Sequence, residues 1–238
     1  LEIYEEYGAA VASNERMVLV GAHLFHNPKC GECGAVHVFL RDQKKPFLLE
    51  GEAPGENLGT AIALSGDLVV IGAAGYYSSG KKSGAALVMR LEGDRLRTIC
   101  RLPGSIAAEE YGASVAIDGR FVVVGAHAGP RFTVHEVQGD TCIPRGEFVS
   151  AGASVAIVGE WIAAGQPGFD GGAKSSGRVA LFHLAADGSL EHRAWLLPKR
   201  VLERGWFGAA VALTKTHVFA GAPGMRDDGT AFVAGARL

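Results

Sequence analysis

One short motif recurs along the whole chain and constrains its fold more than any other feature. Its clearest copy, residues 111–126, has an aromatic residue and a glycine, a short alternating run, a turn, a run of β-branched residues and then Gly-Ala. The other copies are residues 7–22, 58–73, 151–166 and 207–222. Each copy predicts two β-strands joined by a tight turn. Self-similarity at a period of about 50 residues indicates a repeat architecture.

A third apolar run follows each Gly-Ala, and a fourth follows in four of the five repeats. The third runs are residues 34–40, 84–91, 131–137, 177–184 and 229–234, and the fourth runs are residues 46–49, 95–102, 142–149 and 190–197. Four short strands per period predict one antiparallel sheet per repeat. The second strands, such as Val122-Val123-Val124, are apolar on both faces, which is typical of strands covered from both sides.

Radial packing of the repeats would cover these sheets and leave few free edges. We therefore predict an all-β fold, a five-bladed β-propeller of four-stranded antiparallel blades, in a single domain over residues 1–238. The blades are expected at about 7–57, 58–110, 111–150, 151–206 and 207–238. A β-helix is the rival, but its periods are much shorter, and a sandwich would not repeat its sequence.

The fifth blade is expected to lack its outer strand, because no fourth run follows residues 229–234. An unpaired strand edge invites pairing with another segment. We expect the chain to belong to a longer polypeptide or to meet a partner strand at this blade. The alternative is a ring that closes with one three-stranded blade.

Composition excludes several functions. Lysine plus arginine (23) nearly balances aspartate plus glutamate (25), so no large electrostatic field would attract nucleic acid or anionic lipid. No apolar run approaches the roughly 20 residues of a membrane span. We expect neither nucleic-acid binding nor membrane insertion.

Of the four cysteines, only Cys30 and Cys33 are close in sequence, and His26 precedes them by four residues. A disulfide between Cys30 and Cys33, two free thiols, and a metal site that includes His26 are all compatible with this spacing. A closed zinc site needs four ligands. We therefore place the disulfide first and expect no metal and no cofactor.

The motif resembles the FG-GAP repeat family, best known from the propellers of integrin alpha subunits. Phe207-Gly208 and Gly221-Ala222-Pro223 carry the name motif, and Tyr7-Gly8, Leu58-Gly59 and Tyr111-Gly112 are close variants. The resemblance covers essentially the whole chain and implies a propeller at an extracellular or cell-surface location. The family's Asp-rich calcium loop is replaced here by short turns such as residues 118–120, so its calcium site is not expected.

The loops between the second and third strands should share one face with the crossings between blades. Variable loops on a rigid scaffold often carry binding residues, and aromatic and arginine side chains often anchor protein interfaces. The rival interpretation is that these side chains fold back over the blade edges. The candidate partner-binding residues are Phe25, His26, Tyr76, Tyr77, Lys81, Lys82, Phe169, Met225 and Arg226.

The first functional expectation is a non-catalytic binding or scaffolding module that presents these loops to a protein partner, with no catalytic residue. The alternative is a carbohydrate-binding or carbohydrate-active propeller that uses the acidic crossings. Glu6, Glu56 and Glu110 could form a ring of acids around the axis, as a glycosidase-like site would need. His23 and His127 occupy equivalent repeat positions, which favours a structural role for both.

Overall fold

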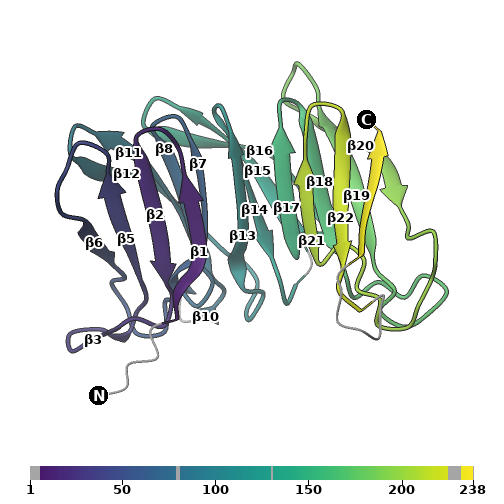
Figure 1. Ribbon diagram of the computed structural model, residues 1–238, viewed down its shortest axis with the longest axis horizontal. Coiled ribbons are helices and arrows are strands. Elements are labelled where there is room, and N and C mark those ends of the chain that lie inside the picture. The colour runs from purple at the N-terminus through teal and green to yellow at the C-terminus, as the bar shows by residue number, and fades with distance from the viewer. Residues whose placement is uncertain (1–5, 79–80, 130, 225–231, 238) are drawn as a thin grey trace.

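The computed structural model describes residues 6–78, 81–129, 131–224 and 232–237. These residues form β-strands and turns, without any helix. Figure 1 shows the sheets standing side by side in sequence order. The prediction of an all-β fold made of antiparallel, propeller-type sheets is confirmed.

Four sheets have four strands, each in the order inner strand to outer strand. The first contains β1 (Tyr7–Ser13), β2 (Met17–Ala22), β5 (Ala35–Leu40) and β6 (Phe47–Glu50), and the second contains β7 (Leu58–Ser65), β8 (Leu68–Ala73), β11 (Ala85–Glu92) and β12 (Arg95–Pro103). The third contains β13 (Tyr111–Asp118), β14 (Phe121–Ala126), β15 (Arg131–Gln138) and β16 (Thr141–Val149). The fourth contains β17 (Ser154–Val158), β18 (Trp161–Gln166), β19 (Arg178–Leu184) and β20 (Leu190–Leu196).

The fifth sheet has three strands within the described residues: β21 (Ala210–Leu213), β22 (His217–Ala222) and β23 (Phe232–Arg237). Two small hairpins, β3 (His26–Asn27) with β4 (Gly31–Glu32) and β9 (Tyr77–Ser78) with β10 (Lys81–Lys82), project from the loops. The inner strands contact one another in the order β1, β7, β13, β17, β21. Among the described residues, β1 and β21 lie at opposite ends of this order, so the predicted closed ring of five blades is not confirmed.

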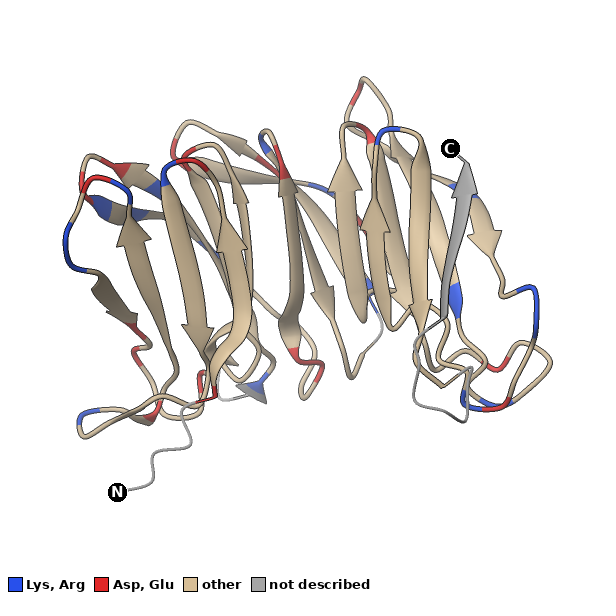
Figure 2. Cartoon of the chain, in the orientation of Figure 1, with Lys and Arg blue, Asp and Glu red and all other residues tan. Residues whose placement is uncertain are grey.

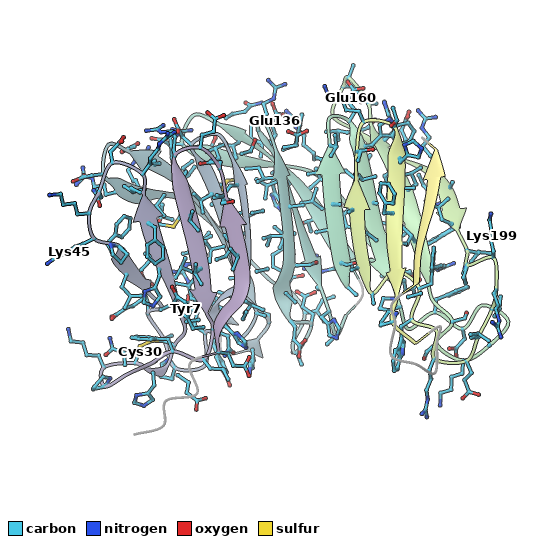
Figure 3. All side chains as sticks on the ribbon, in the orientation of Figure 1. Tyr7, Cys30, Lys45, Glu136, Glu160 and Lys199 are labelled. Carbon is cyan, nitrogen blue, oxygen red and sulfur yellow. A yellow bond between two sulfur atoms is a disulfide. The ribbon has the colours of Figure 1, made fainter. Side chains whose placement is uncertain are left out.

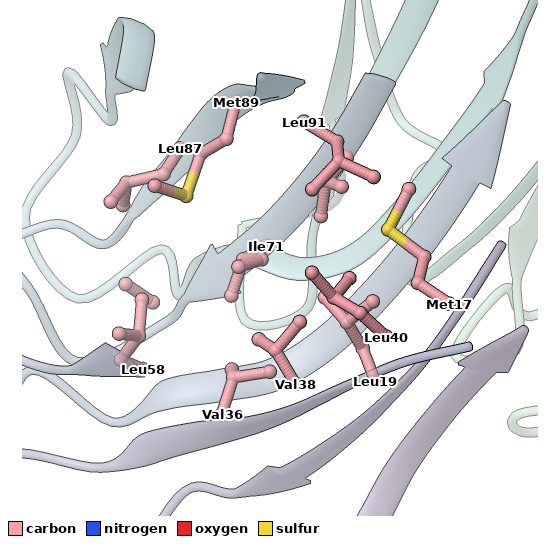
Figure 4. Packing of buried hydrophobic residues seen from close by; sticks show 12 residues of the cluster. Met17, Leu19, Val36, Val38, Leu40, Leu58, Ile71, Leu87, Met89 and Leu91 are labelled. Carbon is pink, nitrogen blue, oxygen red and sulfur yellow. The ribbon is translucent and has the colours of Figure 1, made fainter. Parts of the chain in front are cut away.

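Apolar side chains fill the space between neighbouring sheets. Between the first two sheets, Leu19 and Val38 pack with Val69, Ile71 and Met89, all of them buried (Figure 4). Similar clusters lie between the later sheets. Burying one such side chain contributes about 1.5–3 kcal/mol. This packing explains why the second strands are apolar on both faces: alternate side chains face the preceding and the following sheet.

Each boundary between sheets also brings two glycines of the motif together. A Cβ added to Gly72, in the Gly-Ala of the second sheet, would lie well inside 3.0 Å of the carbonyl oxygen of Gly112, in the Tyr-Gly of the third. Real Cβ atoms do not approach backbone so closely, so the inner backbones can meet only where the side chain is absent. The same arrangement joins Gly21 to Gly59, Gly125 to Gly152 and Gly165 to Gly208.

Disulfides account for all four cysteines. The structure joins Cys30 to Cys33 beside the β3–β4 hairpin, the interpretation placed first above. It also joins Cys100 on β12 to Cys142 on β16, which staples the outer strands of the second and third sheets. No sequence pattern pairs these two, because 42 positions separate them and only the packing of sheets brings them together.

We predict that the bond between Cys100 and Cys142 is the more stabilising of the two. In the chain-entropy account, a cross-link over a loop of this length stabilises by about 4 kcal/mol, against roughly 2 kcal/mol for a loop as short as that between Cys30 and Cys33. The double variant Cys100→Ala/Cys142→Ala should therefore have the lower urea midpoint. The matched control is Cys30→Ala/Cys33→Ala, and a larger loss in the control would contradict the prediction.

Candidate functional site

A hollow of about 530 Å³ opens between the inner parts of the third, fourth and fifth sheets. It lies at the face where the second strands end, the lower face in Figure 1. The elements that meet there are the ends of β14, β18 and β22 and the crossings that lead into β17 and β21. Its lining residues are His127, Ala128, Ala153, Gln166, Pro167, Gly168, Trp206, Ala209 and Pro223.

Trp206 gives the hollow an aromatic wall. It directly precedes the Phe-Gly of the fifth repeat, and its φ of 50° places it in the left-handed region. Its backbone N–H donates to the carbonyl of Ser175 at 3.0 Å, which ties the crossing to the preceding loop. The side chain is 42 % exposed. The backbone of Trp206 is therefore fixed at this point, and part of its large apolar ring is open to a ligand.

Trp206 departs from the residues at the same position in other repeats. Glu6, Asn57 and Glu110 also directly precede the apolar or aromatic residue and glycine that begin their repeats, with φ values of 43°, 55° and 56°. Non-glycine residues seldom adopt this conformation. The repeat thus presents a side chain at this point of every such crossing, and only the fifth presents an aromatic one.

Two polar side chains accompany Trp206 in the hollow. Gln166 ends β18, and its Oε1 accepts a hydrogen bond at 2.7 Å from Nε of Arg178, whose guanidinium lies between the rings of Phe169 and Trp195. Because this bond occupies Oε1, the amide of Gln166 offers its N–H groups as donors. His127 follows β14, and the next two backbone N–H groups donate to the carbonyl of Glu109. The hollow therefore combines an aromatic surface with an amide donor and an imidazole.

The acidic crossings are structural. Glu109 is buried and accepts from Nε and Nη2 of Arg131 at 2.7 and 2.9 Å, and from the backbone N–H groups of Ser105 and Ile106. Burial by itself would raise the pKa of Glu109, but the hydrogen bonds from Arg131, Ile106 and Ser105 outweigh it and lower the pKa. The carboxylate therefore holds the crossing in its turn rather than facing a substrate.

The ring of acids that the sequence raised as an alternative does not form among the described residues, where no three such side chains come together. Glu56 is equivalent to Glu109, not to Glu110, and it is buried with its carboxylate bound by Arg101 at 2.9 Å and by the backbone of Glu52. Glu6 is exposed and contacts His23, with 3.3 Å between Oε2 and Nε2. The place given to Glu56 in this ring was wrong, because its carboxylate is buried in an ion pair with Arg101.

A buried polar network at the third sheet was not anticipated. The hydroxyl of Tyr111 bonds to Thr133, and Oγ1 of Thr133 lies 3.0 Å from Nε2 of His135. The guanidinium of Arg131 sits 5.2 Å from the centre of the Tyr111 ring. Burial and the nearby charge of Arg131 lower the pKa of His135 to about 4, so His135 is neutral in the folded protein at neutral pH.

The candidate partner-binding residues are not brought together. Tyr76 packs under the guanidinium of Arg101 at 4.6 Å and Phe169 lies 3.7 Å from that of Arg178, so both fold back onto the sheets. His26, Tyr77 and Lys82 are exposed, in two separate hairpins.

Phe25 is half-buried before β3. Lys81 belongs to β10, but its side chain is not described, and Met225 and Arg226 lie outside the described residues. None of the described candidates lines the hollow. Partner binding by these residues stays a prediction.

Sequence reasoning missed Gln166 and Trp206 and assigned His127 to structure. The available signal was the replacement of an acid or amide by tryptophan at one repeat position. Within the described ranges, no group of three or more histidine, cysteine, aspartate or glutamate side chains is placed to hold a metal ion. The described residues also contain no helix that is long and apolar enough to cross a membrane.

Comparison with known proteins identifies the fold. No family model matches the chain, and no curated protein sequence matches it. Among solved structures, it is similar to a putative 6-phosphogluconolactonase from Bacteroides fragilis, with a TM-score of 0.56 and 14 % sequence identity over 97 % of this chain and 71 % of that chain. At this identity the likeness concerns the fold.

This comparison corrects the first functional expectation. The sheets of this chain are arranged as in a protein described as an enzyme, so the fold does not indicate a non-catalytic scaffold for a protein partner. That expectation was wrong, because it transferred a function from a motif that specifies how sheets pack.

We predict that His135 makes the protein sensitive to mild acid. The unfolded chain takes up a proton as the pH falls below about 6.5, whereas folded His135 does so only near pH 4. The unfolded state binds more protons in this window. The free energy of unfolding therefore decreases as the pH is lowered, by roughly 2 kcal/mol from about pH 7.5 to pH 5.

Urea unfolding at the two pH values measures this effect. In His135→Gln the loss of stability on acidification should be smaller than in the unchanged protein, while exposed His26→Gln should behave like the unchanged protein. An equal acid dependence in all three proteins would refute the assignment to His135.

Proposed function

We propose that this chain is a carbohydrate-active propeller that binds a sugar-derived ligand in the hollow between its third, fourth and fifth sheets. The observation that carries the proposal is the exposed indole of Trp206 beside Gln166 and His127. Pockets for small molecules commonly pair an apolar or aromatic surface with a few placed polar groups. The C–H face of a sugar ring can stack on an indole, while amide and imidazole groups hydrogen-bond its hydroxyls.

The structural neighbour supports the same ligand class. Its name describes an enzyme that acts on a lactone derived from a phosphorylated sugar acid, and its fold is shared over nearly the whole of this chain. The hollow is large enough for a monosaccharide derivative, since ligand pockets typically enclose about 300–1,000 Å³. The neighbour's activity remains its own, but a sugar-derived ligand is the class that both observations favour.

A hydrolytic version of this proposal rests on His127. Among the described residues that line the hollow, His127 is the one with an ionisable side chain. An imidazole can take a proton from water as the water oxygen attacks a lactone carbonyl, and can return it to the departing ring oxygen. Trp206 and Gln166 would orient the sugar ring during this step.

We further propose an extracellular or cell-surface location. Two disulfides that use all four cysteines are typical of chains that fold in an oxidising compartment. Membership of the FG-GAP family is proposed on its motif alone, with the paired glycines as the physical reason for that motif.

Ligand binding tests the proposal. We expect calorimetry with a panel of saccharides and sugar acid lactones to find a ligand, and Trp206→Ala to weaken its binding about tenfold or more, since loss of about 1.4 kcal/mol of stacking changes affinity tenfold. Tyr77→Ala is the matched control, because Tyr77 is exposed on a hairpin away from the hollow. Equal affinity in the Trp206 variant and the control would exclude the hollow.

Hydrolysis is tested separately. We expect 6-phosphogluconolactone or an unphosphorylated sugar lactone to be opened faster than in buffer, and His127→Asn to reduce this rate about 100-fold, the usual size of a general-base contribution. His23→Asn is the control, because His23 occupies the same repeat position in the first sheet. Turnover by the His127 variant at the unchanged rate would rule out this residue as the base.

A further inference from the structure

Arg178 stands at a repeat position where the third sheet buries an ion pair. Arg131 is the first residue of β15 and Arg178 the first residue of β19, and the carbonyl group of each lies close to the first glycine of the next motif copy. Nε and Nη2 of Arg131 donate to both carboxylate oxygens of Glu109. The third sheet thus neutralises the guanidinium at this position from within the chain.

The fourth sheet provides no acid for Arg178. The residue that matches Glu109 in the crossing into the fourth sheet is Val149, because this crossing is shorter. None of the ion pairs between described residues includes Arg178. Figure 3 shows Glu136 and Glu160 at the upper ends of the sheets, whereas β19 begins at the lower face.

The electrostatic surroundings of the two arginines differ accordingly. The hydrogen bonds from Arg131 to Glu109 raise the pKa of Arg131 and outweigh the effect of burial. Burial lowers the pKa of Arg178, and no described acid counters it. The guanidinium of Arg178 is therefore a partly desolvated cation without an anion.

Aromatic stacking and one hydrogen bond hold this cation in place. Cζ of Arg178 lies 3.7 Å from the centre of the Phe169 ring and 3.4 Å from that of the Trp195 ring. Nε donates to Oε1 of Gln166 at 2.7 Å. The two Nη groups have no acceptor among the described residues, and both remain accessible to solvent. The guanidinium is thus oriented, with its Nη groups available to an external anion.

Arg178 lies next to the hollow. Its hydrogen-bond partner Gln166 is one of the lining residues. The crossing that carries Trp206 runs beside the same strand end, because the backbone N–H of Trp206 donates to the carbonyl of Ser175, shortly before β19 begins. A group attached to a sugar ring on Trp206 therefore has Gln166 and then Arg178 beside it.

The lining of the hollow carries no negative charge that would repel an anion. None of its described lining residues is acidic. Figure 2 shows Lys, Arg, Asp and Glu mainly at the strand ends and in the loops, so the middle parts of the strands add little charge of either sign. An anionic group that enters by the hollow meets the cation of Arg178 without repulsion from the lining.

We propose that Arg178 binds a carboxylate of the ligand, in the role that Glu109 has toward Arg131. The inference rests on the proposed function of the hollow and narrows its ligand to a sugar acid, such as a uronic or aldonic acid. A carboxylate fits because the chain itself fills the equivalent position with one. The planar guanidinium also matches the two oxygens of a carboxylate.

Calorimetry with matched ligands tests the proposal. Malonate presents carboxylates without a sugar ring, and glucuronate has a carboxylate where glucose has a hydroxymethyl group. We expect the unchanged protein to bind malonate and to bind glucuronate about tenfold or more tightly than glucose, as one charge-assisted hydrogen bond implies. Arg178→Met keeps an apolar stem between the two rings. It should lose malonate binding and bind glucuronate no more tightly than glucose.

Two further variants serve as controls. Arg193→Met should bind all three ligands like the unchanged protein, because Arg193 is exposed and pairs with Glu191 outside the hollow. Arg178→Lys keeps the charge but not the planar group, and it should bind malonate more weakly than the unchanged protein. This variant carries the test if Arg178→Met does not fold.

The proposal is overturned if the unchanged protein binds neither acid, or if the Arg178 variants bind both acids as the unchanged protein does. It is also overturned if glucose 6-phosphate binds through Arg178 more tightly than glucuronate, because the group recognised would then be a phosphate.

Failure of the hollow as a sugar site gives a different result. If malonate binds through Arg178 but no saccharide or lactone binds, the carboxylate site stands and the proposed function falls. If Trp206→Ala weakens glucose binding while glucuronate has no advantage over glucose, the proposed function stands and the carboxylate site falls.

Discussion

The close approach of two glycine backbones at each boundary sets the geometry of the whole molecule. Gly72 against Gly112, and its three counterparts, bring neighbouring inner strands nearer than any side chain would permit. The larger residues farther along the strands, such as Val69 and Val70, then fill the space on both sides of each sheet. A repeat that lost either glycine would have to move its sheet outward and leave those side chains unpacked. Close packing of the interior makes such a displacement costly.

Buried ion pairs fix the crossings once the sheets are in place. Glu56 with Arg101 and Glu109 with Arg131 each satisfy a carboxylate inside a turn and tie it to the outer or third strand of a neighbouring sheet. Burying a carboxylate without such partners would be strongly unfavourable. The crossing into the fifth sheet has Gly205 at this position and no comparable acid, and it is there that Trp206 is presented to the hollow. The candidate site therefore coincides with a departure from the repeat.

The regularity of the fold also explains why function was harder to infer than architecture. The glycine and β-branched pattern is a description of packing, and a protein described as a 6-phosphogluconolactonase shares the arrangement with few identical residues. The same packing supports unrelated sites, because the loops and crossings can change without disturbing the boundaries. Tyr76 and Phe169 suggested an exposed interface. Their rings instead stack on Arg101 and Arg178 and so cover the sheets.

The sequence by itself determined the main strands, their order within each sheet and the contact of each repeat with the next, because these depend on local periodicity and on glycines at fixed spacing. It also indicated the link between Cys30 and Cys33, which are three positions apart. Only the tertiary structure decided the link between Cys100 and Cys142, the burial of Glu56 and Glu109, and the meeting of His127, Gln166 and Trp206. Each of these depends on how far one sheet is rotated and displaced from the next. That relation arises from contacts between residues about 20 to 80 positions apart, which no local pattern records.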